Sequence, residues 1–595
     1  MILILASRFD RDAPTLAARW ATHGAQVLTP AGLSVAGWRH TSGSPDGMAM
    51  VAGSPVPTAA IRGVLTRLPA VAADELPHIA PEDRAYVAAE MSAFLCAWLA
   101  ALPCPVVNRA APGALAGPGW WPERWAHTAA RLGIPTRPLR RATCGPPPDP
   151  GPPPALVTVV GERCLGETHA ALRRHARRLA AAAGAQALAV AFSGPGPDAV
   201  LLGAAPWVDV ADPAVADALA ELLTGNDATH DRRLAGTGSG MAVGAPKVAQ
   251  STAAPRRGLH PSSFIPHPSP LALLWGVSGE GPLAIVGAEL DRLGAPWLLL
   301  DQRAILETAV ELEVGAEVAG ALRLPGATLD LAAVGALYAR PYQAAQLPAV
   351  ARAGPGSPAW RHAHAVEAAL LAWSEVTPAL VVNRGDAAAS NSSKPYQLEL
   401  IRRAGLAVPE TLVTTDPGAA LAFWERHGAV VYKSVSGVRS IVRRLAPADR
   451  ARLADLAACP TQLQRYIPGR DYRAHVVGAE VLACAIEADG ADYRYADGVR
   501  VEACALPDDV AAACVAVTAA LGLSVAGVDL RCTPEGEWYC LEVNGAPGFS
   551  YYEEATGQPI GAAIARLLAG ACGAGRRAGS LERRRRYRGG RITIP

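Results

Sequence analysis

The chain is poor in lysine, and two of its three lysines stand where they could bind an anion. Of 55 basic side chains only Lys247, Lys394 and Lys433 are lysines, so 55 − 3 = 52 are arginines. A compact ammonium reaches a crowded phosphate oxygen as a point charge, which suits it better than the broad guanidinium fork. Lys394 precedes a predicted helix, and Lys433 ends the apolar run Val430-Val-Tyr-Lys. We therefore expect Lys394 and Lys433 to contact phosphates, whereas Lys247 lies in a predicted linker.

The segments that follow Lys433 have the composition of a nucleotide site. Ser434-Val-Ser-Gly-Val-Arg-Ser is a turn of small residues whose backbone N–H groups and hydroxyls, including that of Ser436, can cover phosphates. The next predicted strand, Thr461-Gln-Leu-Gln-Arg-Tyr-Ile, halts at Pro468-Gly469. We expect this strand to end at an exposed edge, where unpaired backbone groups suit the Watson–Crick edge of adenine.

Oxygen-bearing side chains then recur at two-residue spacing. Asp471 and Arg473 alternate on one predicted strand, and Glu542 and Asn544 alternate on another, so each pair shares one face of its strand. Asp529 ends the apolar run Val525-Ala-Gly-Val-Asp. Two carboxylates and an amide in an apolar sheet need a cation or other partners to offset their desolvation. Hard oxygen ligands of this kind indicate Mg²⁺ or Mn²⁺ shared with phosphates.

The elements that must position these residues occur twice in the chain. Two long segments match at an offset of about 270 to 275 residues, as internal repeats do. Each copy opens with a strand, helix and strand of the kind that builds a parallel sheet, and each reaches Val-Val-Asn-Arg, at Val106 to Arg109 and at Val381 to Arg384. The repetition predicts two related halves.

The first copy lacks the chemistry of the second. Trp121-Pro122 stands where the second copy has Lys394-Pro395, and about 65 residues around Lys433 have no counterpart. The metal-ligand positions are also apolar in the first copy: Ala191, Leu201 and Gly203 stand opposite Asp529, Glu542 and Asn544. We therefore expect the first copy to bind no ATP and to serve as a structural or substrate-presenting half.

Bulk composition excludes several classes of protein. The chain has 595 residues and a formal net charge of +2, which gives no reason to expect a nucleic acid or a membrane as partner. Its longest apolar stretch is too short and too rich in proline to cross a bilayer. The eleven cysteines are scattered without zinc spacing, which is typical of thiols in a reducing cytoplasm. Residues 224–269 are predicted to be a flexible linker, and residues 573–595 a basic tail.

Seven motifs of the second copy stand in the order of one known family. They are Asn391-x-x-Lys-Pro-x-Gln, Val430-Val-Tyr-Lys, Gln464-x-Tyr-Ile, Asp471-x-Arg, Gly527-Val-Asp, Leu541-Glu-Val-Asn and Glu554-Ala-Thr-Gly-x-x-Ile. Together they resemble the ATP-grasp superfamily, most closely its RimK-type branch. That branch includes amide ligases acting on peptide or protein carboxylates and the macrocyclising ligases of microviridin-like peptides.

The resemblance implies a role for each residue of the second copy. Lys394, Lys433 and Ser436 would bind ATP phosphates, and Asp471 would bind the ribose or a nearby polar group. The adenine hinge would be formed by Gln464, Arg465, Tyr466 and Ile467. Two Mg²⁺ ions would be bound by Asp529, Glu542 and Asn544. Arg473 and Arg494 would be the cations that stabilise the transferred phosphoryl group and the acyl phosphate.

The implied fold is α/β: an ATP-grasp fold after a Rossmann-like pre-ATP-grasp domain, with a truncated duplicate in front. The predicted domains are residues 1–110 and 111–223 for the first copy, and residues 270–385 and 386–572 for the second, with a small nucleotide lobe at about 409–470. The implied activity is an ATP-dependent carboxylate–amine ligase. A phosphotransferase and a non-catalytic ATP-binding scaffold remain alternatives, and assembly as a homo-oligomer stays open.

Overall fold

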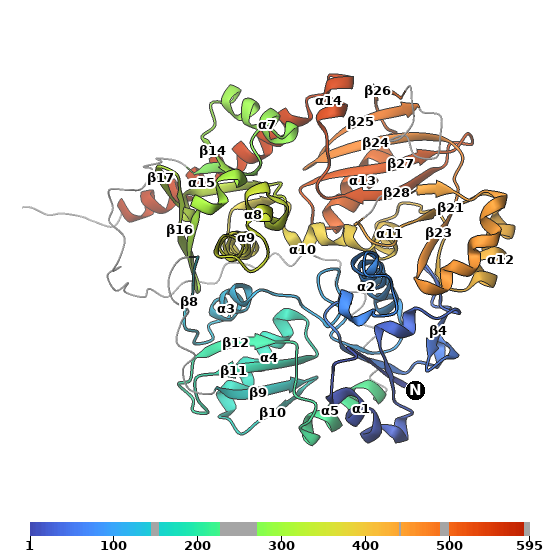
Figure 1. The fold of residues 1–595 in the computed structure, drawn as a ribbon. Helices are drawn as coiled ribbons and strands as arrows, with labels where there is room; N and C mark the ends of the chain where they lie inside the picture. Colours follow the sequence, from blue (N-terminus) through green and yellow to red (C-terminus); the bar gives the residue numbers. More distant parts are fainter. Residues whose placement is uncertain (144–153, 226–269, 439–441, 488–498, 588–595) are drawn as a thin grey trace, which may run out of the picture.

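The computed structural model describes residues 1–143, 154–225, 270–438, 442–487 and 499–587, with side chains as far as residue 573. Residues 1–225 and 270–587 form two halves that lie against each other (Figure 1). Each half contains a parallel sheet and an antiparallel sheet.

The parallel sheets have equivalent strand orders. In the N-terminal half the order is β2-β1-β6-β7, formed by β1 (Ile2–Ala6), β2 (Gln26–Leu28), β6 (Gly63–Arg67) and β7 (Val106–Val107). In the C-terminal half the order is β14-β13-β18-β19, formed by β13 (Leu271–Gly276), β14 (Trp297–Asp301), β18 (Val334–Ala339) and β19 (Leu380–Val382). Both first strands are buried along their whole length. Continuous apolar runs of this kind form parallel strands that are covered on both faces.

The antiparallel sheets also have similar strand orders. One has the order β10-β9-β11-β12, formed by β9 (Ala155–Val160), β10 (Arg163–Leu165), β11 (Ala187–Phe192) and β12 (Leu201–Ala205). The other has the order β26-β25-β24-β27-β28, formed by β24 (Arg470–Val477), β25 (Glu480–Glu487), β26 (Arg500–Cys504), β27 (Val525–Cys532) and β28 (Trp538–Asn544). The C-terminal sheet therefore has longer strands and one more of them.

The asparagine of Val-Val-Asn-Arg joins the two sheets of each half in the same way. Oδ1 of Asn108 accepts hydrogen bonds from the N–H groups of Gln186 and Ala187 at 2.9 and 3.0 Å. Oδ1 of Asn383 accepts from Ser524 and Val525 at 2.8 and 3.3 Å. The repeated motif thus has a structural role in both halves, because it satisfies buried backbone donors where the second sheet begins.

Two further sheets are each shared between the halves. One has the order β22-β21-β23-β20-β3-β4-β5. Its C-terminal strands are β20 (Thr411–Thr414), β21 (Val430–Lys433), β22 (Val442–Arg444) and β23 (Thr461–Arg465), and its N-terminal strands are β3 (Arg39–Thr41), β4 (Gly47–Val51) and β5 (Ser54–Pro57). The other has the order β17-β16-β15-β8, formed by β15 (Ala309–Val314), β16 (Val318–Leu324), β17 (Ala327–Asp330) and β8 (Leu139–Ala142).

This exchange is reciprocal. A hairpin of the N-terminal half extends the predicted small lobe of the C-terminal half, and a hairpin of the C-terminal half extends β8 of the N-terminal half. The sequence predicted that the first copy lacks the whole small lobe. In the structure, the single strand β8 pairs with β15 of the other half, as β20 pairs with β3.

Helices make matching contacts between the halves. Helix α2 (Arg84–Ala101) packs on α11 (Lys394–Arg403), and α3 (Pro122–Arg131) packs on α9 (Pro358–Val376). Ser393 Oγ donates to the carbonyl of Ala93 at 2.7 Å at the first contact, and Arg124 pairs with Glu375 at 3.4 Å at the second. Both α3 and α11 begin with a proline in their first two positions, Pro122 and Pro395, and the residues before these prolines are Trp121 and Lys394.

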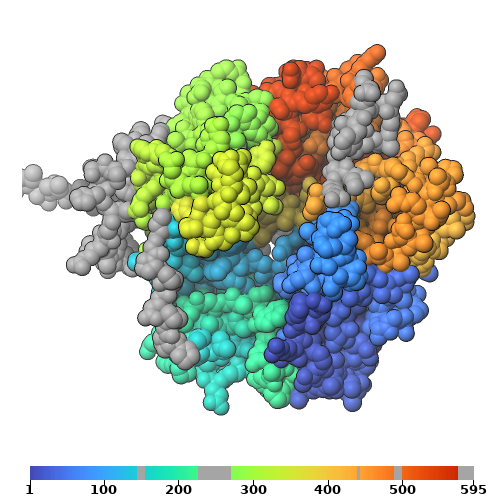
Figure 2. All heavy atoms as spheres, viewed as in Figure 1, coloured from blue at the N-terminus to red at the C-terminus, as the bar shows by residue number. Residues whose placement is uncertain are grey.

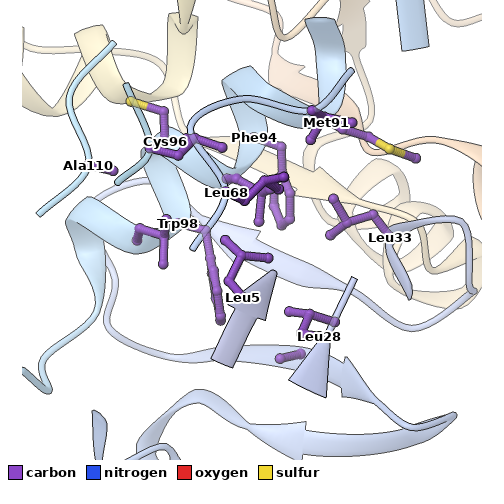
Figure 3. Close-up of a cluster of buried hydrophobic side chains, with 14 of the residues drawn as sticks. Leu5, Leu28, Leu33, Leu68, Met91, Phe94, Cys96, Trp98 and Ala110 are labelled. Carbon is purple, nitrogen blue, oxygen red and sulfur yellow. The ribbon is translucent and has the colours of Figure 1, made fainter. Parts of the chain in front are cut away.

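One hydrophobic cluster extends across the interface between the halves. Figure 3 shows its centre, where Phe94 and Trp98 of α2 lie over Leu5 and Leu28 of the parallel sheet. The same cluster includes Val413 and Val435 of the C-terminal half, both fully buried. The two halves therefore share one apolar core. Burial of apolar surface is the dominant favourable contribution to folding, so this core stabilises their association.

Other helices cover the sheets. In the N-terminal half they include α1 (Asp12–Arg19), α4 (Ala170–Ala183) and α5 (Pro213–Thr224). In the C-terminal half they include α7 (Gly281–Arg292), α8 (Pro348–Ala353), α10 (Gly385–Ala388), α12 (Pro417–His427), α13 (Asp508–Ala520), α14 (Ser550–Thr556) and α15 (Ile560–Tyr587). Helix α15 continues to Tyr587, so the first part of the predicted tail is helical. Among the described helices, none combines the length and apolar character that a membrane crossing requires.

Candidate functional site

Three of the predicted site residues lie in one row across the C-terminal antiparallel sheet. Arg473 on β24 is directly opposite Asp529 on β27, which is directly opposite Glu542 on β28. Arg473 Nη1 donates to Asp529 Oδ1 at 2.5 Å. The Arg473 side chain is 6% exposed and that of Asp529 is 27% exposed, so solvent reaches the carboxylate more readily than the guanidinium. The row thus presents two carboxylates beside one fixed cation.

Gly527 makes room for this arginine. A Cβ at Gly527 would lie 2.2 Å from Arg473 Nη2 and 2.5 Å from its Cζ, so the guanidinium rests directly on the glycine. Asn544 is the residue opposite Gly527 on β28, and its Oδ1 accepts a hydrogen bond from the N–H of Ala546 at 2.9 Å. The glycine of Gly527-Val-Asp therefore has a steric reason that the sequence pattern alone did not reveal.

A second ion pair lies next to the row. Asp471, expected to bind the ribose, makes two hydrogen bonds of 2.6 Å with Arg531, which is opposite it on β27. Arg531 also donates to the carbonyl of Ile467 at 3.1 Å. Sequence reasoning missed Arg531, although Asp471-x-Arg473 faces Asp529-x-Arg531 with complementary charges. The Asp471 carboxylate therefore already has a cationic partner, Arg531, which also contacts the predicted hinge at Ile467.

The two lysines converge from different elements. Lys433 ends β21, and Lys394 is the first residue of α11. Burial lowers the pKa of Lys433, and the nearby carboxylate of Glu542 opposes that effect. The positive charge of Lys394 adds to the lowering, so the two ammonium groups lie within electrostatic range of each other. A multiply charged anion would relieve this repulsion, as expected for a phosphate site.

The strand of the predicted adenine hinge is not at the exposed sheet edge that the sequence suggested. Strand β23 is not at an edge, because it lies between β20 and β21 in the seven-stranded sheet. The N–H groups of Arg465 and Tyr466 donate to the carbonyls of Glu410 and Ala429 at 2.9 and 3.0 Å. These donors are therefore used within the protein. The prediction of an exposed edge was wrong because β23, which follows β22 in sequence, inserts between β21 and β20.

The first residue of the predicted hinge also faces the protein interior. Gln464 is buried, and its Nε2 donates to Thr411 Oγ1 at 3.0 Å. The buried Ile467 places its carbonyl against Arg531. Adenine recognition at this segment would rest on backbone groups of residues 465–467 that the neighbouring strands do not take.

The turn after Lys433 is held by the other half of the chain. Glu90 of α2 accepts hydrogen bonds from Val435 N at 2.6 Å, Ser436 N at 3.0 Å and Ser436 Oγ at 2.5 Å. The carbonyl of Ser436 in turn accepts a hydrogen bond from Lys394 Nζ. Sequence reasoning missed Glu90. The available signal was a lone glutamate within an apolar helix, and nothing local links it to residues far along the chain.

Arg494, the second predicted catalytic cation, lies outside the described residues. The positions of the N-terminal half that match the row by strand register carry no charge. Leu156 pairs with Ala191 where Arg473 pairs with Asp529, and Ala189 pairs with Thr158 where Gly527 pairs with His475. Gly203 pairs with Ala191 where Glu542 pairs with Asp529, and Ala205 pairs with Ala189 where Asn544 pairs with Gly527. The expected matches of Leu201 with Glu542 and of Gly203 with Asn544 were therefore wrong by two residues, because the sequence alignment did not fix the strand register. None of these N-terminal residues carries a charge or a metal ligand.

The predicted metal ligands fit a divalent cation that also contacts phosphate. Asp529, Glu542 and Asn544 offer hard oxygen atoms on one face of two paired strands. Within the described residues, no three histidine, cysteine, aspartate or glutamate side chains gather as a metal site would require. A cation here would therefore take two carboxylates and an amide from the chain and its other ligands from phosphate or water.

Comparisons with known proteins agree with this geometry. The RimK-like ATP-grasp domain family matches residues 390–568. A probable alpha-L-glutamate ligase of Teredinibacter turnerae is 28% identical over 33% of this chain and 68% of its own length. A probable alpha-L-glutamate ligase of Pseudoalteromonas translucida is 31% identical over 30% of this chain and 64% of its own length. The chain thus spans about two thirds of these relatives.

Solved structures of similar proteins include peptide ligases. The ATP-grasp ligase PsnB, complexed with a phosphomimetic variant of its minimal precursor, Mg and ADP, is 27% identical, with 51% of this chain and 99% of PsnB covered and a TM-score of 0.44. The macrocyclase MdnC of Microcystis aeruginosa, bound with precursor peptide MdnA, is 20% identical, with 50% and 99% covered and a TM-score of 0.44. The family match and the curated relatives show that residues 390–568 form a RimK-like ATP-grasp domain. The chain is therefore an enzyme of the ATP-grasp ligase class.

Proposed function

We propose that this chain joins a carboxylate to an amine at the expense of ATP, with an acyl phosphate as intermediate. The observation that carries the proposal is the row of Arg473, Asp529 and Glu542 beside the two convergent lysines. Phosphoryl transfer from ATP requires positioned cations around the phosphates more than covalent chemistry by the protein. The chain supplies such cations from three elements: Arg473 on β24, Lys433 at the end of β21 and Lys394 at the start of α11.

In the proposed reaction, a carboxylate oxygen of the substrate attacks the γ-phosphorus of ATP, and ADP leaves. An amine nitrogen then attacks the acyl carbon, loses a proton and expels inorganic phosphate, so that an amide forms. Lys394 and Lys433 would hold phosphate oxygens, and Arg473 would stabilise negative charge on the transferred group. Asp529 would keep the Arg473 guanidinium in place through the 2.5 Å hydrogen bond.

Asp529, Glu542 and Asn544 would hold Mg²⁺ or Mn²⁺, and the family resemblance implies two ions. When bound, these ions supply neutralisation of the phosphate charge. The residues themselves contribute oxygen atoms on one face of the sheet, because β27 and β28 pair directly at Asp529 and Glu542. The hydrogen bond from Arg473 also restrains the Asp529 carboxylate.

The carboxylate substrate belongs, in this proposal, to a peptide or protein. The names of the curated relatives, alpha-L-glutamate ligases, support an amino-acid or peptide substrate. We place the reaction in the cytoplasm, where ATP is available.

We further propose that residues 1–225 are a truncated duplicate of residues 270–572, each beginning with a Rossmann-like domain. Support comes from the equivalent strand orders, the matching asparagine contacts and the reciprocal hairpins. The duplicate would bind no ATP, because Leu156, Ala189 and Ala191 replace the charged row and its glycine. The chain would then contain a single catalytic site.

The test uses the full chain with Mg²⁺, ATP, glutamate-containing peptides and a set of amines. The expected product has the mass of the two substrates less one water. Sustained ADP release should require both substrates, because the amine must consume the acyl phosphate that remains after ADP has left. The Lys433→Met variant serves as control and should form neither product. ADP formation with a phosphorylated acceptor and no amide would instead indicate a phosphotransferase, and ATP binding without turnover under all substrates would indicate a scaffold.

A further inference from the structure

The turn that would bind phosphate is anchored by a carboxylate from the other half of the chain. Glu90 lies in the middle of α2 and is 3% exposed. Two backbone N–H groups and one hydroxyl, all from Val435 and Ser436, donate to it at 2.5 to 3.0 Å. One turn earlier in α2, the hydroxyl of Tyr86 lies 3.3 Å from Ser434 Oγ. The turn is thus attached to α2 along three consecutive residues.

A buried carboxylate has a large influence on the groups that solvate it. Removing an anion from water is costly unless several donors replace the lost hydration, and charged hydrogen bonds are the stronger kind. Here the replacing donors are backbone groups of the turn itself. Any departure of the turn from its position would leave Glu90 buried and poorly solvated, so the carboxylate favours one turn conformation.

That conformation is connected directly to both lysines. Ser436, which donates to Glu90, also accepts the hydrogen bond of Lys394 Nζ through its carbonyl. Lys433 is separated from Val435 by a single residue along the chain. Helix α2 also contacts the start of α11, where Ser393 Oγ donates to the carbonyl of Ala93 at 2.7 Å. Helix α2 therefore contacts both segments that contain the lysines.

The rest of the small lobe is fixed to the N-terminal half as well. Strand β3 pairs with β20, so the lobe has no separate sheet of its own. Arg39 Nε donates to Asp416 at 2.7 Å, and Ser34 Oγ donates to the carbonyl of Ala458 at 2.8 Å. Figure 2 shows the blue N-terminal residues packed directly against the orange residues of the lobe. The lobe and the N-terminal half share one continuous sheet.

We propose that Glu90 is a positioning residue for the phosphate-binding turn, and that the N-terminal half serves as a built-in subunit that orders the nucleotide site of the other half. This proposal rests on the proposed role of Lys394 and Lys433 in binding ATP. It gives the half without a catalytic site a specific task, namely to hold Ser436 and the two lysine-bearing segments in their binding geometry.

The test compares Glu90→Gln with a matched control, Glu75→Gln, in the full chain. Glu75 is also 3% exposed and also accepts a backbone N–H and a serine hydroxyl, from Arg8 and Ser7, but these lie within the N-terminal half. In Glu90→Gln, one acceptor oxygen is replaced by an NH₂ group that faces the donors of the turn. Affinity for Mg·ADP is measured by calorimetry, and thermal unfolding is measured without nucleotide.

Glu90→Gln should weaken Mg·ADP binding by roughly tenfold or more, the size of a lost charged hydrogen bond, whereas Glu75→Gln should leave it unchanged even if both lower the melting temperature alike. Equal affinities in the two variants would overturn the proposal. Ser436→Ala, a milder change, should weaken binding less, and its effect should be non-additive with Glu90→Gln. Additive effects would count against a shared turn. Wild-type chain that binds Mg·ADP but forms no amide would refute the ligase and not the role of Glu90.

Discussion

The contact between Gly527 and Arg473 allows a sharp test of the catalytic row. Gly527→Ala adds one methyl group, whose carbon would lie 2.2 Å from Arg473 Nη2. Ordinary contact begins at 3.4 Å, so the guanidinium must withdraw by about 3.4 − 2.2 = 1.2 Å. The φ angle of Gly527 is not among the positive ones, so alanine can adopt the same backbone. The substitution therefore acts mainly on the position of the arginine.

The expected loss follows from the geometry. The hydrogen bond from Arg473 to Asp529 is 2.5 Å long, and a shift of that size disrupts it or moves both groups. A lost hydrogen bond between charged groups costs about 1.5 to 3 kcal/mol, which corresponds to roughly 10- to 100-fold in rate. A misplacement of about 1 Å in a catalytic group has a similar effect. We expect kcat/KM for amide formation to fall by that factor.

The assay is ADP and amide formation with the substrates that the functional test identifies, together with thermal unfolding. Ala189→Gly, at the matching position of the N-terminal sheet, serves as control. It should lower stability by roughly 0.5 to 1 kcal/mol and leave turnover unchanged. Arg473→Met should show the loss of Gly527→Ala, and the double variant should show little more. Full turnover of a folded Gly527→Ala protein would refute the assignment of Arg473.

Three further predictions concern other charges. Lys433→Met should slow turnover by roughly 100-fold or more, checked by ADP release, because one phosphate donor is lost. Glu542→Gln should raise the Mg²⁺ concentration for half-maximal rate by roughly tenfold, measured by metal titration, because one ligand charge is removed. Burial lowers the pKa of His40 from 6.5 to about 4. The unfolded chain therefore binds this proton first, and stability should fall by roughly 3 kcal/mol as pH drops from 6.5 to 4, less so in His40→Leu, as measured by urea unfolding.

Much of the candidate site could be read from the sequence because it depends on local periodicity. Two-residue spacing predicts that Glu542 and Asn544 share a face, since side chains alternate along any strand. The internal repeat was equally accessible, because it preserved Val-Val-Asn-Arg and the order of the strands around it. Arg531 could have been found in the same way, from the complementary charges of Asp471-x-Arg473 and Asp529-x-Arg531.

Features that depend on strand order could not be read in this way. The sequence predicted an exposed edge after Gln464, but β23 inserts between β20 and β21, and its backbone donors are used there. The sequence predicted a small lobe at about residues 409–470, whereas its sheet also contains β3 to β5 of the N-terminal half. Sheet neighbours are chosen by long-range packing and closure, and no local pattern encodes which distant strand will pair.

The sequence by itself determined which chemical groups this protein has. The C-terminal half contains two well-placed lysines and a set of oxygen ligands, and the N-terminal half has neither at the matching positions. The tertiary structure alone decided how the two halves contact each other. It placed the Glu90 carboxylate on the turn after Lys433 and rested Arg473 on Gly527. The physical reason is that residue types record which charges are available, while the desolvation and hydrogen bonding that give those charges their effect arise only where distant segments meet.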